Sequence, residues 1–95
     1  MIFPVSIELY EEVKSRLIEA IDDRNYFSGH VECSYEGWEC RLVCSCFVYR
    51  TTELLPEGVA HPITDLVPVW WEFHTADSEA ERLNDFSFSE LRRLL

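Results

Sequence analysis

The apolar residues near the start of the chain recur with the period of an amphipathic helix. One stripe is formed by Tyr10, Val13, Leu17, Ala20 and Ile21. Ser6 is a suitable N-cap, because its hydroxyl oxygen can accept a hydrogen bond from a free N–H of the first turn. The short polar residues at 22–25 favour a turn and predict where the helix ends.

A period of two then takes over and predicts an antiparallel hairpin with its loop at Glu36-Gly37. In that register Cys33 faces Cys40 on an apolar face, and Glu32 faces Arg41 on the opposite face. A slip by one residue would bring Glu32 onto the apolar face, so the register is well specified. Glu-Gly is a weaker turn pair than Asn-Gly, which leaves a longer loop as the alternative.

The two faces of this hairpin differ in character along its length. The apolar face carries all four cysteines: Cys33, Cys40, Cys44 and Cys46. The other face is polar near the loop but becomes apolar at Val43, Phe47 and Tyr49. Beyond the loop region, the strands over residues 27–49 are therefore expected to be covered on both sides.

The next two segments predict a loop and a third strand. Prolines and a glycine interrupt residues 51–65, and the apolar residues of this loop predict that it packs against the body: Leu54, Leu55 and Val59. Alternation over Leu66–Thr75 predicts a strand with Trp71 on the core side. The other side of that strand carries Leu66, Pro68, Trp70, Glu72 and His74. Since proline cannot donate to a ladder, the strand is expected at an edge or to start late.

The C-terminal part predicts a short helix after an acidic connection. Residues 76–85 read as a loop, with a helical turn or a short fourth strand near residues 81–83 as alternatives. Ser87 and Glu90 fit a capping box and predict the helix start. Helices outside a run of strands are typical of the α+β class. We expect one domain over residues 1–95: an N-terminal helix, an antiparallel three-stranded meander (four-stranded if the short strand forms) and a short C-terminal helix, in the order α-β-β-β-α.

Charge and composition narrow the classes of partner. The chain has 95 residues, 47% of them apolar, and a net charge of −10. Phosphate backbones and anionic membranes are bound through clusters of Lys and Arg, so direct binding to nucleic acid or membrane is not expected. The sequence shows neither a secretory signal nor a membrane-spanning run, which favours a cytoplasmic protein with reduced thiols. The chain looks like the small proteins common in bacterial accessory genes, which favours a bacterial origin.

Candidate chemistry is limited to thiols and one polar cluster. The cysteine spacing differs from the close pairs of zinc sites, so core packing is the expected role; a Cys33–Cys40 disulfide would require oxidation. The strand faces bring together a polar cluster of His30, Glu32, Arg41, Glu72 and His74, which fits either acid–base work or a solvated sheet surface. No nucleophile, phosphate-loop or metalloprotease motif is present, and we expect no catalytic residue, metal or cofactor.

The aromatic residues give the most specific functional hypothesis. The second sheet face gathers a candidate interaction surface of Val43, Phe47, Tyr49 and Trp70. Either the C-terminal helix covers these side chains or another chain does. We therefore expect a non-catalytic protein-interaction module, a homodimer formed through this aromatic face.

Two other functions remain open at this stage. Residues 51–90 carry nine acidic groups and one basic group, which suits an acidic nucleic-acid mimic that inhibits a basic protein. The second alternative is a small thiol or metal protein, or an enzyme, that uses the cysteines or the polar cluster.

Overall fold

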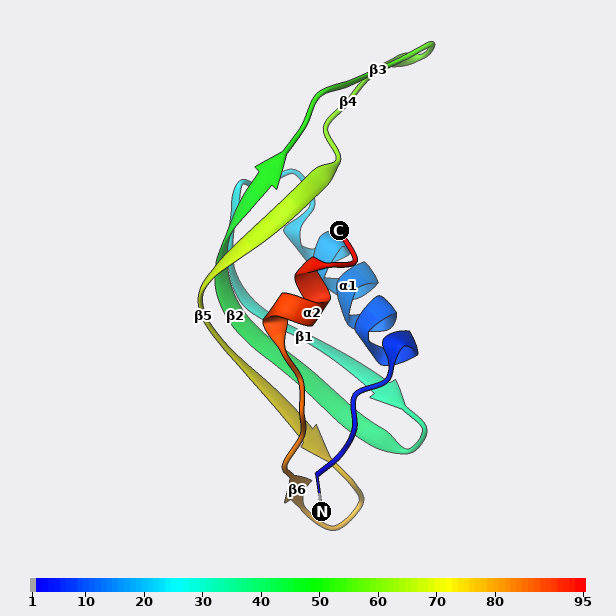
Figure 1. Ribbon diagram of the computed structural model, residues 1–95, viewed down its shortest axis with the longest axis vertical. Coiled ribbons are helices and arrows are strands. Elements are labelled where there is room, and N and C mark those ends of the chain that lie inside the picture. The colour runs from blue at the N-terminus through cyan, green and yellow to red at the C-terminus, as the bar shows by residue number, and fades with distance from the viewer. Residues whose placement is uncertain (1) are drawn as a thin grey trace.

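The computed structural model describes residues 2–95, and its first element is the predicted N-terminal helix, α1 (Ile7–Ile21) (Figure 1). The Oγ atom of Ser6 accepts a hydrogen bond from the N–H of Leu9 at 3.2 Å, which confirms the predicted cap. The apolar stripe of the helix is buried through Leu9, Tyr10, Val13, Leu17 and Ile21. The helix ends at Asp22, whose positive φ of 55° turns the chain toward the sheet.

An antiparallel sheet with the order β1-β2-β5-β6 forms the centre of the molecule. Its strands are β1 (Tyr26–Tyr35), β2 (Trp38–Arg50), β5 (Ile63–Ala76) and β6 (Glu81–Arg82). The predicted register of the first hairpin is confirmed at every pair of β1 and β2. Glu36 and Gly37 both have positive φ (49° and 83°), as a two-residue type I′ turn requires, so the longer loop was wrong. The sheet has four strands rather than three, and β6 confirms the predicted alternative of a short fourth strand near residues 81–83.

A β-bulge in β5 reverses the faces predicted for the first part of this strand. Trp70 and Pro68 pair with consecutive residues of β2, so Val69 between them is an extra residue. Leu66, predicted to face away from the core, is 1% exposed, whereas Val69, predicted on the core side, is 59% exposed. The alternation failed because one inserted residue shifts it by one position. Since β6 pairs only with the last two residues of β5, Pro68 lies on a stretch of edge, as predicted.

The predicted loop at residues 51–65 instead contains a second, two-stranded sheet, here termed the arm. It consists of β3 (Glu53–Leu55) and β4 (Gly58–Ala60), and it projects from one end of the molecule (Figure 1). The expected packing against the body is wrong: Leu54 and Val59 face each other across the arm and are 81% and 57% exposed. The arm extends past the ends of both helices, so neither helix offers it an apolar surface to pack on.

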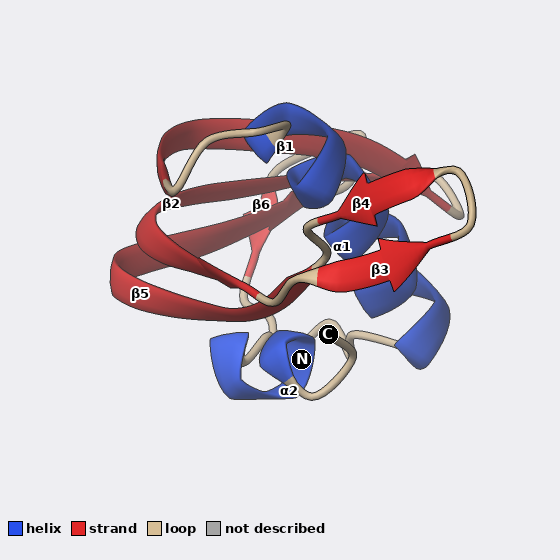
Figure 2. Ribbon diagram, turned by 90° about the horizontal axis from the view of Figure 1, so that it is seen from above, coloured by secondary structure: helices blue, strands red, loops and turns tan. Residues whose placement is uncertain are grey.

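Both helices lie on the same face of the sheet, which we term the inner face (Figures 1 and 2). The second helix is α2 (Phe88–Arg92), and it buries Phe88 and Leu91. Ser87 occupies the N-cap position, but its side chain makes no capping bond, so the predicted capping box was wrong. Its N–H instead donates to the Tyr10 hydroxyl at 3.0 Å, which ties α2 to α1. One cluster of buried side chains joins the two helices to the inner face.

No helix within residues 2–95 is long and apolar enough to cross a membrane. The C-terminal helix, one of the two candidates for covering the aromatic face, packs on the inner face beside α1. The opposite sheet face, termed the outer face, is therefore left without a helix in the described part of the chain.

Candidate interaction surface

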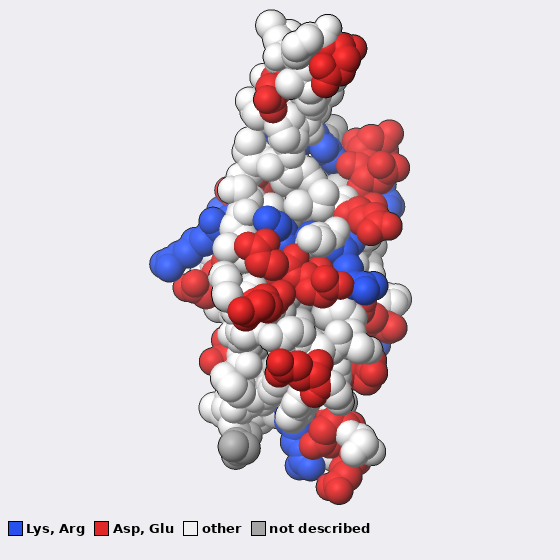
Figure 3. All heavy atoms as spheres, turned by 90° about the vertical axis from the view of Figure 1, so that its right-hand side faces the viewer, with Lys and Arg blue, Asp and Glu red and all other residues white. Residues whose placement is uncertain are grey.

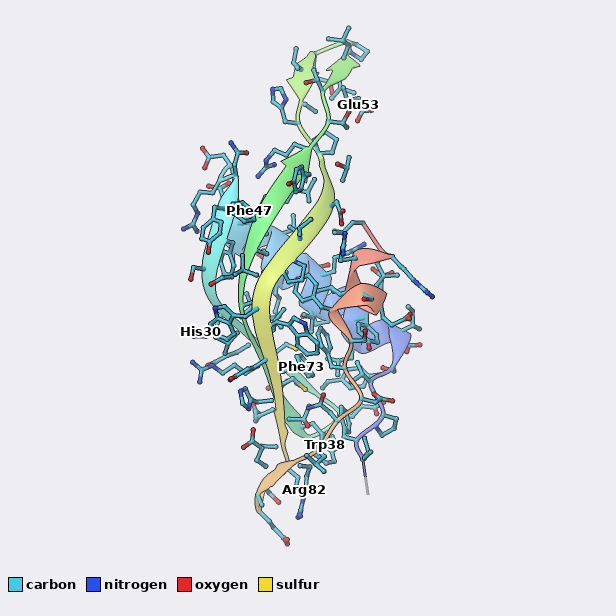
Figure 4. All side chains as sticks on the ribbon, turned by 60° about the vertical axis from the view of Figure 1, so that its left-hand side comes forward. His30, Trp38, Phe47, Glu53, Phe73 and Arg82 are labelled. Atoms are coloured by element: carbon cyan, nitrogen blue, oxygen red, sulfur yellow. The ribbon has the colours of Figure 1, made fainter. Side chains whose placement is uncertain are left out.

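The outer face carries four large aromatic side chains, here termed the aromatic patch. They are Tyr26, Phe47, Tyr49 and Trp70, and each is between 44% and 54% exposed. Figure 4 shows Phe47 on the side of the sheet opposite to Phe73, which faces the helices. Three members of the patch were predicted, and the fourth predicted residue, Val43, is half-buried on the same face.

Strands β1, β2 and β5 bring the patch together. Tyr26 and Phe47 are cross-strand partners, and their ring centroids lie 5.1 Å apart with an interplanar angle of 65°, an edge-to-face contact. Trp70 on β5 lies opposite Ser45, two residues before Phe47 on β2. Tyr49 follows two residues after Phe47 and therefore shares its face. Tyr26 is the member that was not predicted. A hairpin with its loop at Glu36-Gly37 pairs Tyr26 with Phe47, so the predicted register could have identified it.

The residues that separate the aromatic rings on the outer face are uncharged. Ser28 and Ser45 are cross-strand partners whose hydroxyl groups lie 2.8 Å apart and hydrogen bond to each other. Val67 is the β5 partner of Phe47. A second protein surface placed on the patch would therefore not have to remove water from an ion at its centre, which lowers the cost of burial.

The predicted polar cluster lies on the same outer face, closer to the β1–β2 turn. Glu32, Arg41 and His74 form one row across β1, β2 and β5, because each is the cross-strand partner of the next. A carboxylate oxygen of Glu32 lies 3.9 Å from Nε of Arg41 and 3.7 Å from Nε2 of His30. These distances describe loose, solvent-exposed ion pairs, which contribute little to stability.

His74 is held between two carboxylates. Its Nε2 lies 3.1 Å from Glu72 and its Nδ1 lies 2.5 Å from Glu81. The hydrogen bonds to Glu81 and Glu72 raise the pKa of His74, since both favour the protonated ring. Glu81 was not among the predicted members, because only the short strand β6 brings it beside His74. Both ring nitrogens of His74 are therefore engaged by carboxylates of the chain itself.

A shallow hollow of about 380 Å³ lies over this cluster, lined in part by Arg41, His74 and Glu81. The four cysteines belong to β1 and β2, and their free thiols are buried on the inner face of the sheet. Within residues 2–95, no three His, Cys, Asp or Glu side chains come together as a group that could hold a metal ion.

The acidic side chains do not form one continuous row. Figure 3 shows them in several groups on the helix side of the molecule, with basic side chains between the groups. Within residues 51–90, Asp65 binds Arg92 through contacts of 2.9 and 2.8 Å, and the guanidinium lowers the pKa of that carboxyl group. Asp77 accepts hydrogen bonds from the N–H groups of Ala80 and Glu79, and it binds Arg82 at 2.8 Å. The chain's own cations thus neutralise part of the segment suggested as a nucleic-acid mimic.

A second exposed apolar group lies on the arm, at Leu54 and Val59. Sequence reasoning missed its exposure, because apolar residues beside proline and glycine are equally compatible with a packed loop.

No protein-family model matches the chain, and no curated protein or solved structure is significantly similar to it.

Proposed function

We propose that the protein is a non-catalytic interaction module that forms a homodimer through the aromatic patch. The observation that carries this proposal is the exposure of four neighbouring aromatic side chains on a sheet face that no helix of the described chain covers. Tyrosine and tryptophan are the residue types most enriched where protein surfaces bind each other tightly. The largest exposed apolar patch of a monomeric protein is often a binding site.

The size of the patch fits the centre of an interface. A large aromatic side chain offers about 150–250 Å² when fully exposed, so four half-exposed rings leave roughly 400 Å² of apolar surface. A stable dimer of standard size buries about 800 Å² on each partner. The patch would therefore supply the apolar core of the interface, and the surrounding polar residues would supply its rim.

A second copy of the chain is the partner we propose for this uncovered sheet face. Two such faces can stack about 10 Å apart with their side chains interdigitated, and a two-fold axis lets each patch cover the other. Each copy carries a net charge of −10, so the copies repel at long range, but the uncharged centre of the patch avoids repulsion at contact. The proposal takes the protein to be cytoplasmic, which accords with its four free cysteines.

Sedimentation velocity over a wide range of concentration tests the proposal. We expect the wild-type protein to dimerise and the double variant Phe47→Thr/Trp70→Thr to remain monomeric, because the variant removes the two largest apolar members. Leu83→Ser is the matched control, since Leu83 is 75% exposed but lies outside the patch. A wild-type protein that stays monomeric up to millimolar concentration contradicts the proposal.

Salt distinguishes this dimer from a complex with a basic protein. Screening weakens the repulsion between two acidic copies, so added salt should strengthen the dimer. Binding to a basic partner would weaken under the same conditions, because its attraction is electrostatic. Salt-weakened capture of a basic protein by a monomeric chain would favour the acidic inhibitor over the homodimer.

A further inference from the structure

The four buried cysteines are not equivalent, because only two of them are cross-strand neighbours. Cys33 on β1 and Cys40 on β2 are partners in the hairpin register, and both are free thiols, 7% and 2% exposed. We propose that Cys33 and Cys40 form an oxidisable dithiol, which hydrogen peroxide converts into an intramolecular disulfide across the β1–β2 hairpin. This site is independent of the aromatic patch, which lies on the other face of the sheet.

The turn fixes the separation of the two cysteines. In a hairpin with a two-residue type I′ turn, the residues that flank the turn, here Tyr35 and Trp38, form a hydrogen-bonded pair. Pair types alternate along an antiparallel ladder, so Cys33 and Cys40 form a hydrogen-bonded pair as well. The Cα atoms of such pairs lie about 5.5 Å apart, within the usual range for disulfides. The Cβ atoms of directly opposed residues lie about 4.5–5.5 Å apart, at or beyond the upper end of the disulfide range of about 3.5–4.5 Å, so closing the bond requires the two strands to move slightly closer together.

The other two cysteines are less well placed. Cys44 and Cys46 lie on the same strand with one residue between them, so their Cα atoms are about 6.6–6.8 Å apart, at the upper limit for a disulfide. Their side chains leave the strand in parallel, and their β1 partners are Gly29 and Phe27 rather than cysteines. Cys44 and Cys46 also hydrogen bond to each other, but Cys33 and Cys40 are the one cross-strand pair among the four thiols.

Cys33 is the better candidate for the first attack on peroxide. It lies on the edge strand β1, and it is the more exposed of the two thiols. A hydrogen bond from the Cys40 thiol, with a smaller contribution from the Arg16 guanidinium, lowers the pKa of Cys33. The same hydrogen bond and burial raise the pKa of Cys40. A lower pKa increases the fraction of thiolate, which is the reactive form.

The reaction consumes one peroxide for each disulfide. The Cys33 thiolate attacks one peroxide oxygen and breaks the O–O bond, which yields a sulfenic acid and a hydroxide that takes up a proton to form water. The Cys40 sulfur then attacks the sulfenic sulfur, the S–O bond breaks, and the released hydroxide takes the Cys40 proton to form a second water. The two thiols lose two electrons and two protons in total, and the peroxide gains them.

Mass spectrometry of the whole, natively folded chain tests this assignment. The protein is treated with one equivalent of hydrogen peroxide, denatured, alkylated without reduction and mapped by peptides. We expect a Cys33–Cys40 link in the monomer, with Cys44 and Cys46 both alkylated. Cys33→Ala and Cys40→Ala should each abolish the link, whereas Cys44→Ala and Cys46→Ala should retain it as matched controls.

The wild-type peptide map decides the question even if a variant fails to fold. Four alkylated thiols after excess peroxide would overturn the proposal, as would a Cys44–Cys46 link, a link between chains, or a single cysteine oxidised to sulfinic acid. None of these outcomes bears on the aromatic patch, so the dithiol and the proposed homodimer fail separately.

Discussion

The inner and outer faces of the sheet are built from alternate residues of the same strands, yet they end in different environments. On β2, Cys44 and Cys46 have no exposed surface, whereas Phe47 and Tyr49 are 50% and 54% exposed. The inner face is covered by α1 and α2, and the outer face has no such layer in the described chain. A strand that is apolar on both faces therefore needs two covers, and this chain shows only one of them.

The largest expected effect comes from truncating the inner face. Leu42→Ala removes a side chain that is 1% exposed, and we expect a loss of about 2–5 kcal/mol in the free energy of unfolding. Phe47→Thr on the same strand should cost the monomer less, about 0.5–1.5 kcal/mol, mainly through the lost edge-to-face contact with Tyr26. Urea denaturation of dilute protein measures both. An equally large loss for Phe47→Thr would mean that the outer face is already part of the monomer core.

Removing a buried hydroxyl group should also destabilise the protein more on the inner face than on the outer face, with smaller changes in the free energy of unfolding. Thr75 on the inner face has no exposed surface, donates to the Arg82 carbonyl at 2.9 Å and lies 3.3 Å from the Asn84 amide. Thr75→Val removes the donor to the Arg82 carbonyl and one of two acceptors of the Asn84 amide, which keeps its bond to the Phe73 carbonyl, and should cost about 1–2 kcal/mol. Ser45→Ala on the outer face should cost less, because its partner Ser28 is exposed and can turn to water. Equal costs, measured by thermal and urea unfolding, would remove the distinction between the faces.

The smallest expected effect is the pH dependence of the outer-face ion pairs. The pKa of His74 is raised by Glu81 and Glu72, so its contribution to stability is fully present below the unfolded value of about 6.5 and is lost as the pH rises through the folded pKa. His74→Gln should therefore lower the unfolding midpoint slightly near pH 6 and leave it unchanged at high pH. An NMR titration of the ring that gives a folded pKa at or below the ordinary value contradicts this.

The parts of the fold that alternation and charge specify could be predicted from the sequence. The β1–β2 register followed from the apolar face and the Glu32–Arg41 pair. A slip by one residue would expose the apolar side chains and bury the charged pair. The inward position of all four cysteines followed from the same register. Phe47 and Tyr49 followed too, because the alternation of β2 continues to Tyr49, and Trp70 followed because it lies on the C-terminal side of the bulge in β5.

The other parts of the fold and of the site depend on features that no hydrophobic period in the sequence marks. The bulge at Val69 inserts one residue without a glycine or a charge to mark it, so the face of Leu66 was assigned wrongly. The position of α2 depends on Tyr10, whose hydroxyl oxygen accepts a hydrogen bond from the N–H of Ser87, a residue far away in the sequence. Glu81 joins His74 only through a two-residue strand. Each of these is a tertiary contact that local pattern does not encode.

The arm has a practical consequence of its own. Its two strands contact each other and little else, at the far end of a molecule 50 Å long. A short hairpin on its own is only marginally stable in water, so its backbone amides should exchange with deuterium long before those of β2 open. A fluorophore or affinity tag attached near Glu57 would therefore report on whatever approaches this end of the protein while the hydrophobic core stays undisturbed.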